Sequence, residues 1–324
     1  MGIVGSKHSY NPDQDIPDLS GKVIIVTGGN TGVGYHTVKA LVTHDAKVYM
    51  ASRNESRATG AIAQLTAEGA LDGKGQVEWL KLDLSSPESI NAAVEEFQKK
   101  ERRLDVLVNN AGVKYVHFCF CGCSFEALIA RSHVGPFIFT TKLLPLLKET
   151  AAEADSDVRI VNVASSGHAT TMKNDWKNGD WNWKSVGFQQ DIEAYGSSKL
   201  ANMLTCKELQ RRLDEEGVPI VSTMLHPGTV YADGGAASFR NVPFIGSLVV
   251  APIMKYIVCL TPEQGAHTSL FAATSPMVKE QKDLYAGAYL VPFGTITKPS
   301  AECEDLQAAK DCWETTDKVV KQLY

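Results

Sequence analysis

The sequence predicts an α/β fold in a single domain: a doubly wound parallel sheet of about seven strands, with helices on both faces in three α/β/α layers. Two observations predict it. Apolar runs rich in β-branched residues alternate with longer segments of helical pattern along the chain. These runs are continuously apolar, which is typical of strands buried on both faces. No internal repeat, low-complexity tract or long linker divides the 324 residues.

The first two strands and their helices come early in this pattern. Residues 23–26 are apolar throughout and are followed by glycines, so we expect the first strand there, and residues 33–45 carry a helical pattern. Residues 47–53 are predicted as the second strand, and the Ala- and Gln-rich stretch 55–69 as the helix after it.

The third and fourth strands are predicted at residues 77–84 and 104–112. Between them, Ser86 precedes Pro87. A capping residue followed by proline in the first turn indicates where a helix begins.

The fifth, sixth and seventh strands are predicted at residues 158–165, 219–228 and 287–292. A long amphipathic helix over residues 195–217 separates the fifth strand from the sixth and ends at Gly217. Ligands of such sheets bind at the carboxyl ends of the strands, and each motif below lies at one of those ends.

Composition limits the classes of function. The chain is long enough, and apolar enough, to bury one large core. A formal net charge of −5, with no block of Lys or Arg, argues against nucleic acid as a partner. The seven cysteines are an odd number and no secretory signal precedes them, which indicates reduced thiols and a cytoplasmic location.

Two segments lie outside the alternating pattern. We expect residues 1–17 to form an N-terminal arm before a domain at 18–324, and residues near 232–262 to form a substrate lid. Residues 242–260 are apolar and nearly long enough to span a membrane, but two prolines and Lys255 interrupt them. We therefore expect a lid and no membrane contact, with a contact at the membrane surface as the alternative.

A glycine-rich turn follows the first strand and reads Thr-Gly-Gly-Asn-Thr-Gly-Val-Gly over residues 27–34. Glycines permit a tight turn and close approach of a pyrophosphate, and the next helix offers it free N–H groups and a positive dipole end. Between an apolar strand and a helix, such a turn predicts a Rossmann-type dinucleotide site. Its predicted contacts are Gly28, Asn30, Thr31, Gly32, Val33 and Gly34.

The end of the second strand predicts which dinucleotide binds. Ser52 and Arg53 stand where an NAD site usually has Asp or Glu. A guanidinium pairs with a 2′-phosphate that a carboxylate would repel, so we predict NADP(H) as the cofactor. The alternative is that Arg53 is a solvated surface residue whose charge Glu55 partly cancels.

Three further strand ends are expected to contact the cofactor. The residues are Asp83, Leu84, Asn110, Ala111, Gly112, Pro227, Gly228 and Val230. Asp83 could accept the adenine amino group, and it is equally explained as a turn residue. The small residues at 110–112 let the backbone lie close to the adenine ribose. We expect His226 to be structural.

Tyr195 and Lys199 are predicted as a catalytic pair. Residues four apart lie on one helical face, so both side chains reach the same site. A free phenol has a pKa near ~10, and a nearby ammonium favours the phenolate. Tyr195 would then take the proton of an alcohol during oxidation and return it during reduction. Both residues are also predicted cofactor contacts, because Lys199 would hold the ribose hydroxyls.

Ser165 follows the fifth strand and is the third predicted catalytic residue. A hydroxyl at this position faces the crevice and can stabilise charge that grows on a substrate oxygen. A serine after a strand is alternatively a helix cap or a turn residue.

These motifs together resemble the short-chain dehydrogenase/reductase family over roughly residues 18–300: TGGNTGVG, LDL, NNAG, the serine after VNVA, YGSSK and HPG. VYMASRNESRA, TPEQGAHTSLFAA and the long segment between serine and tyrosine are similar to its retinol-dehydrogenase-like and WW-domain-oxidoreductase-like branch. The resemblance implies Ser165, Tyr195 and Lys199 as catalytic residues. It implies cofactor contacts from Gly28, Asn30, Gly32, Gly34, Arg53, Asp83, Asn110 and Lys199.

The sequence departs from the family pattern in three places. Ser132 replaces the asparagine that anchors a water beside the lysine, and Ala232 replaces a threonine that often contacts the carboxamide. Residues 113–131 have an unusual composition for a usually polar loop and helix. The alternate cysteines at 119–123 lack a distant partner pair, so we expect no metal site.

We expect an oxidoreductase that uses NADP(H) on a small hydrophobic or aromatic alcohol or carbonyl compound. Trp176, Trp181 and Trp183 indicate an apolar pocket, or alternatively pack a long loop. The second hypothesis is a catalytically impaired NADP(H)-binding sensor or interaction module, which Ser132 and residues 113–131 motivate. A homodimer is left open.

Overall fold

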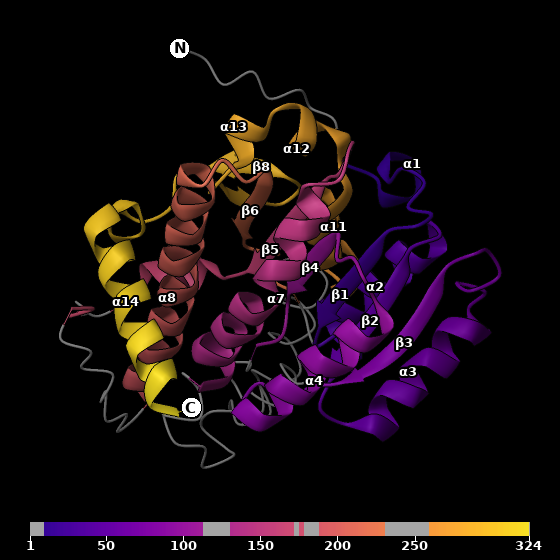
Figure 1. Ribbon diagram of the computed structural model, residues 1–324, viewed down its shortest axis with the longest axis horizontal. Coiled ribbons are helices and arrows are strands. Elements are labelled where there is room, and N and C mark those ends of the chain that lie inside the picture. The colour runs from indigo at the N-terminus through magenta and orange to yellow at the C-terminus, as the bar shows by residue number, and fades with distance from the viewer. Residues whose placement is uncertain (1–9, 113–129, 172–174, 178–187, 231–258, 324) are drawn as a thin grey trace, which may run out of the picture.

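The computed structural model describes residues 10–112, 130–171, 175–177, 188–230 and 259–323. Figure 1 shows a central sheet with helices on both faces. The sheet has eight strands in the order β3-β2-β1-β4-β5-β6-β7-β8. All neighbouring strands are parallel except β7 and β8, which are antiparallel. The predicted three-layer α/β fold is confirmed.

Every predicted strand is present. The strands are β1 (Val23–Thr27), β2 (Lys47–Ser52), β3 (Gln76–Lys81), β4 (Val106–Asn109), β5 (Val158–Val163), β6 (Ile220–Leu225), β7 (Tyr289–Val291) and β8 (Thr295–Thr297). The order of the strands reverses between β1 and β4, so a crevice opens there at their carboxyl ends.

Helices of several kinds connect and cover the strands. They are α1 (Pro12–Asp15), α2 (Gly32–Thr43), α3 (Glu55–Ala67), α4 (Pro87–Lys100), the π-helical turn η2 (Ala130–Val134), α7 (Gly135–Ala151), the 3₁₀ turn η3 (Ser166–Ala169), α8 (Phe188–Glu215), α11 (Pro262–Thr274), α12 (Pro276–Glu280), α13 (Lys282–Tyr285), the 3₁₀ turn η6 (Ala301–Glu304) and α14 (Leu306–Leu323).

Apolar cores hold these helices to the sheet. On one face, α4, α7 and α8 pack over the strands through side chains such as Leu147. On the other face, α2, α3 and α11 do so through side chains such as Leu41 and Leu270. A third core around Leu204 and Cys312 joins α8 to α14, and these two helices lie side by side in Figure 1. The helix α8 is therefore held on two sides, by the sheet and by α14.

The expected start of α4 and end of α8 are confirmed. Ser86 caps α4 by accepting a hydrogen bond from the Ser89 N–H (3.1 Å), with Pro87 in the first turn. Gly217 follows α8 with φ 66°, a conformation that glycine adopts without strain.

Two elements differ from the expectation. The helix α8 begins at Phe188, so Tyr195 lies inside it and not in its first turn. The strand β8 was not predicted, because three residues with a partly exposed pattern carry too little apolar signal. It pairs with β7 across a hairpin whose Gly294 has φ 79°.

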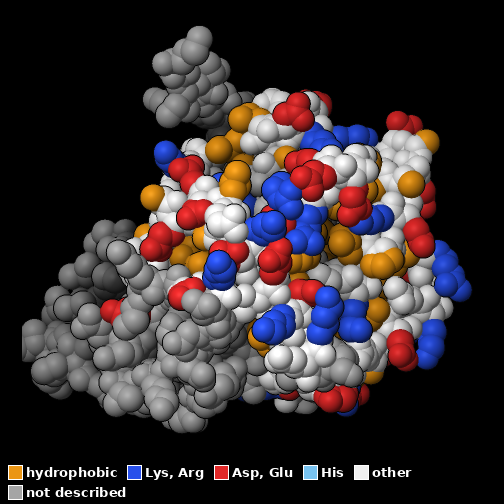
Figure 2. All heavy atoms as spheres, turned by 60° about the vertical axis from the view of Figure 1, so that its left-hand side comes forward, with side chains coloured by type: hydrophobic (Ala, Val, Ile, Leu, Met, Phe, Trp, Pro, Cys, Tyr) orange, Lys and Arg blue, Asp and Glu red, His pale blue; other side chains and the backbone are white. Residues whose placement is uncertain are grey.

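The surface mixes charges of both signs. Figure 2 shows Lys and Arg side chains interspersed with Asp and Glu over the visible face, and no large block of one sign. Ion pairs within helices account for part of this pattern, such as Arg211 with Glu208 and Glu215 on α8, and Lys321 with Asp317 on α14. Among the described residues, no helix has both the length and the apolar character needed to cross a membrane.

Candidate active site

A cleft of about 470 Å³ opens at the carboxyl ends of the central strands, a volume typical of sites for small molecules and cofactors. It lies at the reversal of strand order described above. Its walls are Gly28, Asn30, Thr31, Gly32, Val33, Gly34, Asn110, Ala111, Gly112, Val163, Ala164, Ser165, Tyr195, Lys199, His226, Pro227, Gly228, Val230 and Pro262. Most of the residues predicted from the sequence to form a site thus line a single cleft.

The glycine turn between β1 and α2 forms one end of the cleft. Gly28 and Gly32 have positive φ angles of 65° and 57°, which glycine adopts without strain. A Cβ on Gly34 would lie 2.5 Å from Asn110 Nδ2, so only glycine fits at this position. Thr31, at the N-cap of α2, makes no side-chain cap bond, which leaves N–H groups of the first turn available to an anion. The turn therefore fits a pyrophosphate.

Asn110 fastens the end of β4 to this turn. Its Nδ2 donates to the carbonyl of Thr27 (2.8 Å) and more weakly to that of Gly28 (3.4 Å). The Ala111 N–H donates to Thr27 Oγ1 (2.9 Å). The Asn110 side chain is therefore a brace of the loop, in addition to lining the cleft.

Tyr195 and Lys199 reach the cleft from the same face of α8, as predicted. The Nζ of Lys199 lies 5.7 Å from the centroid of the Tyr195 ring. It donates to the carbonyl of Val163 at the end of β5 (3.3 Å). Lys199 is only 4% exposed, so the protein and any bound ligand, and not bulk water, set the position of its ammonium.

Ser165 lies next to Tyr195 because two glycines let η3 approach α8. A Cβ on Gly167 would lie 3.2 Å from Tyr195 Cε1 and 3.5 Å from Ser165 Oγ. A Cβ on Gly196 would lie 2.5 Å from the Gly167 carbonyl oxygen. Ser165 also caps η3, since its Oγ accepts from the Gly167 N–H (3.1 Å). The structure thus gives Ser165 the capping role and places it on the same cleft as Tyr195, with Gly167 between its hydroxyl and the Tyr195 ring.

Two histidines support the serine side of the site. His168 is buried and its Nδ1–H donates to the Ser165 carbonyl (2.7 Å), while its Nε2 accepts from the Ser300 N–H (3.2 Å). His226 lines the cleft, and its pKa is lowered by burial and then by the nearby His168. Both facts make His226 a neutral wall residue. His226 was not among the predicted cofactor contacts, although it directly precedes Pro227, which was.

The position of the family's usual asparagine is buried. Ser132 lies in the π-helical turn η2, and its hydroxyl has no hydrogen-bond partner among the described residues. Its carbonyl accepts from Asn202 Nδ2 (2.6 Å), one turn beyond Lys199 on α8. Asn202 Oδ1 in turn bonds His133 Nδ1 (2.9 Å). The side-chain amide of Asn202 therefore lies next to residue 132. It comes from α8, whereas the family pattern has its asparagine at position 132 itself.

Four predicted cofactor contacts do not line the cleft: Ser52, Arg53, Asp83 and Leu84. Arg53 is exposed after β2, and the buried Ser52 Oγ has no partner in the described part of the chain. Asp83 has the turn role, because its Oδ1 accepts from both the N–H and the Oγ of Ser85 (3.0 and 2.6 Å). Leu84 packs in the core. Cofactor contacts from these four residues stay predictions.

Several expectations lie outside the described residues: the alternate cysteines at 119–123, Ala232, most of the lid, Trp181 and Trp183. Trp176 is described, and it packs in the core between α8 and α14 with its carbonyl accepting from Thr315 Oγ1 (2.7 Å). For this tryptophan the packing interpretation holds. Within the described ranges, no three His, Cys, Asp or Glu side chains gather as metal ligands would.

Comparison with known proteins gives consistent matches. The sequence model described as short chain dehydrogenase matches residues 22–175. The short chain dehydrogenase/reductase dpchH of Colletotrichum higginsianum is 42% identical over 315 residues, which cover 94% of this chain and 76% of that protein. A short-chain dehydrogenase/reductase of Armillaria gallica is 36% identical over 324 residues, covering 98% and 99%.

Solved structures share the fold. A crystal structure of a protein from Mycobacterium paratuberculosis superimposes with a TM-score of 0.70 at 25% identity, covering 97% of this chain and 98% of that one. The angucycline C-6 ketoreductase LanV, determined with bound NADP, has a TM-score of 0.62 at 22% identity and covers 86% and 96%. At that identity the likeness to LanV is one of fold alone.

Proposed function

The chain belongs to the short-chain dehydrogenase/reductase family, and on this premise we propose that it is an NADP(H)-dependent oxidoreductase of a hydrophobic alcohol or carbonyl compound. One observation carries the proposal. The phenol of Tyr195 and the ammonium of Lys199 line the same cleft as the glycine turn at residues 28–34. A proton-transferring group and an anion-binding turn in one cleft are what transfer of hydride to a carbonyl requires.

The residues of the cleft divide the proton chemistry between them. The buried Lys199 ammonium lies 5.7 Å from the centroid of the Tyr195 ring, so its positive charge acts on the phenol. Tyr195 therefore takes the hydroxyl proton from an alcohol and, in the reverse direction, protonates the oxygen of the reduced carbonyl. Ser165, beside the phenol, donates a hydrogen bond to the same substrate oxygen as negative charge grows on it.

The walls of the cleft fit a nicotinamide dinucleotide. The N–H groups at the start of α2 and the glycines at 28, 32 and 34 would hold the pyrophosphate, and Lys199 the nicotinamide ribose. When bound, the cofactor supplies or accepts the hydride. Arg53 is exposed and has no carboxylate within ion-pair distance among the described residues, so its guanidinium is available to a 2′-phosphate. This position is the basis for proposing NADP(H) over NAD(H).

A second candidate function rests on Ser132. Its hydroxyl is buried without a partner among the described residues, and its carbonyl is already occupied by Asn202. The path by which Lys199 would recover a proton from solvent therefore differs from that of the family pattern. A protein that binds NADP(H) and turns over slowly or not at all is the alternative that this difference favours.

The decisive comparison is wild type against Tyr195→Phe, which removes the phenolic oxygen and keeps the ring. NADPH consumption is measured with a panel of hydrophobic ketones and aldehydes, and NADPH affinity by fluorescence titration. Because the phenol transfers the proton, we expect activity to fall by about a hundredfold or more while affinity changes little. Equal turnover by both proteins would overturn the catalytic role of Tyr195.

The same experiment separates the two candidates. Tight NADPH binding without turnover in either protein would support the non-catalytic candidate. Ser132→Asn then tests its cause, because a gain in rate would locate the defect at that position. A rate unchanged by Ser132→Asn would show that proton recovery does not depend on this side chain.

A further inference from the structure

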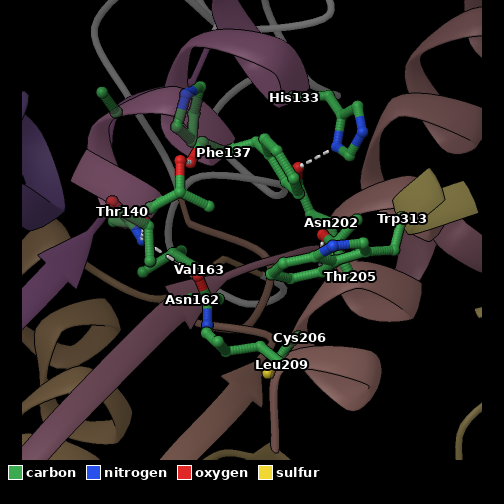
Figure 3. Close-up of a pocket in the computed structure, with 14 residues that line it drawn as sticks. His133, Phe137, Thr140, Asn162, Val163, Asn202, Thr205, Cys206, Leu209 and Trp313 are labelled. Atoms are coloured by element: carbon green, nitrogen blue, oxygen red, sulfur yellow. Dashed lines mark hydrogen bonds between the residues drawn. The ribbon is translucent and has the colours of Figure 1, made fainter. Parts of the chain in front are cut away.

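A second, smaller cavity of about 30 Å³, partly open to the surface, adjoins the cleft between the ends of β4 and β5 and the helices α7, α8 and α14. Figure 3 shows its lining, with Thr140 on the left and His133, Asn202 and Trp313 on the right. Amides, hydroxyls and a thiol supply the polar part of the wall: Asn109, Asn162, Asn202, Thr140, Thr141, Thr205 and Cys206. The space is too small for a substrate but large enough for water, which needs about 10–15 Å³.

Side-chain hydrogen bonds cross the sheet beside this cavity. Asn109 on β4 donates through Nδ2 to Thr140 Oγ1 (2.9 Å) and to Asn162 Oδ1 on β5 (3.0 Å). Asn162 Nδ2 donates in turn to the Thr223 carbonyl on β6 (3.3 Å) and to Ser222 Oγ (3.4 Å). The two amides thus connect three neighbouring strands close to their carboxyl ends.

One hydrogen-bond acceptor in this network receives no hydrogen bond. Asn109 Oδ1 is buried and has no hydrogen-bond partner among the described residues. Turning the Asn109 amide over would not help, because it would set Oδ1 against Asn162 Oδ1. Turning Asn162 as well would set its oxygen against the Thr223 carbonyl. The orientation of both amides is therefore fixed, and Asn109 Oδ1 needs an outside donor.

A matching donor lies on the same wall. Thr140 Oγ1 accepts from Asn109, and its own proton has no acceptor in the part of the chain that the structure describes. A water molecule accepts from this hydroxyl and donates to Asn109 Oδ1, which satisfies both groups. The oxygen of Thr205, whose proton goes to a helix carbonyl, is a further acceptor on the wall. A buried water typically makes about three such bonds.

We propose that this cavity is an ordered-water site, in which at least one water bridges the buried Asn109 Oδ1 and Thr140 Oγ1 and so fixes the strand ends that hold Lys199. Two wall residues, Ala111 and Val163, line both the cavity and the cleft. Val163 follows Asn162 directly, and its carbonyl accepts from Lys199 Nζ. Asn109 and Thr140 are then positioning residues, which act on Lys199 through Val163.

The water itself is tested without any turnover. Crystals of the cofactor-free, full-length protein, at a resolution that shows ordered water, should have density within hydrogen-bond distance of Asn109 Oδ1 and Thr140 Oγ1. Thr140→Val keeps the shape and removes the hydroxyl, so it should lose this water. Thr141→Val is the matched control, because Thr141 lines the same cavity but its hydroxyl bonds its own helix. A dry cavity in the wild type, or a water retained in Thr140→Val, would overturn the proposal.

A solution measurement covers the case in which Thr140→Val does not fold. Magnetic relaxation dispersion of water in the wild-type protein should detect at least one long-lived internal molecule, and Thr205→Ile, which fills the cavity, should remove it. An internal-water signal that Thr205→Ile leaves unchanged would contradict the assignment to this cavity.

The link to Lys199 rests on the proposed oxidoreductase function and is read from the pH profile of kcat/KM. If the strand ends shift, the Lys199 ammonium moves relative to the Tyr195 ring, so Thr140→Val should change this profile and Thr141→Val should not. Thr140→Ser, which keeps a hydroxyl, should restore the wild-type profile. An unchanged profile in Thr140→Val would refute the link to Lys199. Absence of any turnover in the wild type would refute the proposed function and leave the crystallographic result standing.

Discussion

Among single side chains, Lys199 of the proposed catalytic pair is held by the backbone and not by an opposite charge. It is buried, and its Nζ donates a hydrogen bond to the Val163 carbonyl. No carboxylate lies within ion-pair distance of its Nζ among the described residues. Its charge therefore acts on the neighbouring phenol and on whatever ligand enters the cleft, in a region from which water is largely excluded.

We propose that Arg53 sets the preference for NADPH over NADH. Arg53→Ala should weaken NADPH binding by about ten- to a hundredfold, because a charge-assisted contact is typically worth about 1.5–3 kcal/mol, and should leave NADH nearly unchanged. Fluorescence titration of both cofactors measures the effect. Arg102→Ala is the control, since it removes the same charge from an exposed residue that precedes β4, at the amino ends of the strands and away from the cleft. Equal weakening of NADPH and NADH by Arg53→Ala would refute the contact with a 2′-phosphate.

The side chains of the proposed catalytic site could be predicted from the sequence better than their supports. Ser165, Tyr195 and Lys199 were found because their spacing and their positions after a strand or on one helical face are local properties. The Val163 carbonyl and the contact of Asn202 with Ser132 were not found, because each joins residues on different elements. Asp83 stayed ambiguous for a similar reason, since turn and ligand roles use the same carboxylate.

At the level of elements, the contact between η3 and α8 sets the geometry of the site. Gly196 faces the Gly167 carbonyl so closely that a Cβ would lie 2.5 Å from it. Gly196 is therefore required for the packing of α8 against η3, in addition to its place between Tyr195 and Lys199. Ser165, at the N-cap of η3, keeps its position relative to Tyr195 only while this contact is intact.

Gly196→Ala tests this contact. The added methyl forces α8 away from η3 and separates Ser165 from the phenol, so kcat should fall about ten- to a hundredfold, as expected for displacements near 1 Å. Gly60→Ala in the exposed part of α3 is the matched control, because a Cβ there meets no atom within 4 Å. That control should keep full activity and gain about 0.5–1 kcal/mol of stability. Normal kcat in Gly196→Ala would show that the contact does not position Ser165.

Strands and helices were predictable to the extent that their patterns are strong. The strands β1, β2, β5 and β6, which are buried over most of their length, were all found within a few residues of their bounds. The helix α14 was not predicted, although it packs along α8 and brings Trp313 onto Phe137 and Arg212. Its apolar residues recur at helical spacing, so the sequence did carry a signal for this helix.

Over the whole molecule, His133 joins elements that are distant in sequence. It is fully buried in η2, with Nδ1 bonded to Asn202 Oδ1 on α8 and Nε2 to Thr316 Oγ1 on α14 (3.0 Å). Burial lowers its pKa to about 4, although the bond to Asn202 opposes the shift. The neutral ring therefore ties the start of α7 and the last helix to the helix that carries Tyr195.

This histidine makes stability depend on pH. Unfolded His133 titrates near pH 6.5 but the folded ring near 4, so the unfolded state binds the extra proton between these values. Stability should fall as pH decreases from about 6.5 towards 4, by about 2 kcal/mol at pH 5. Urea unfolding at pH 7 and pH 5 measures the loss. His133→Gln should reduce this pH dependence, and an identical dependence in both proteins would contradict the assignment.

The overall architecture was the most predictable level, because alternation of strands and helices admits few topologies. The same topology explains why the site could be inferred without coordinates. Parallel strands bring their carboxyl ends to one edge, so residues as far apart as Gly28 and His226 meet in one cleft. The branch of the family, the substrate and the lid near 232–262 stay predictions, since they depend on specific contacts and not on topology.

The most direct test of the account is a crystal structure of the full-length protein with NADP⁺. We expect the pyrophosphate to bind on the turn at residues 28–34 and the 2′-phosphate to lie beside Arg53. The nicotinamide should lie between Tyr195 and the Pro227–Gly228 turn. A nucleotide bound elsewhere, or one in the cleft with the Tyr195 hydroxyl facing away from its nicotinamide, would contradict the account.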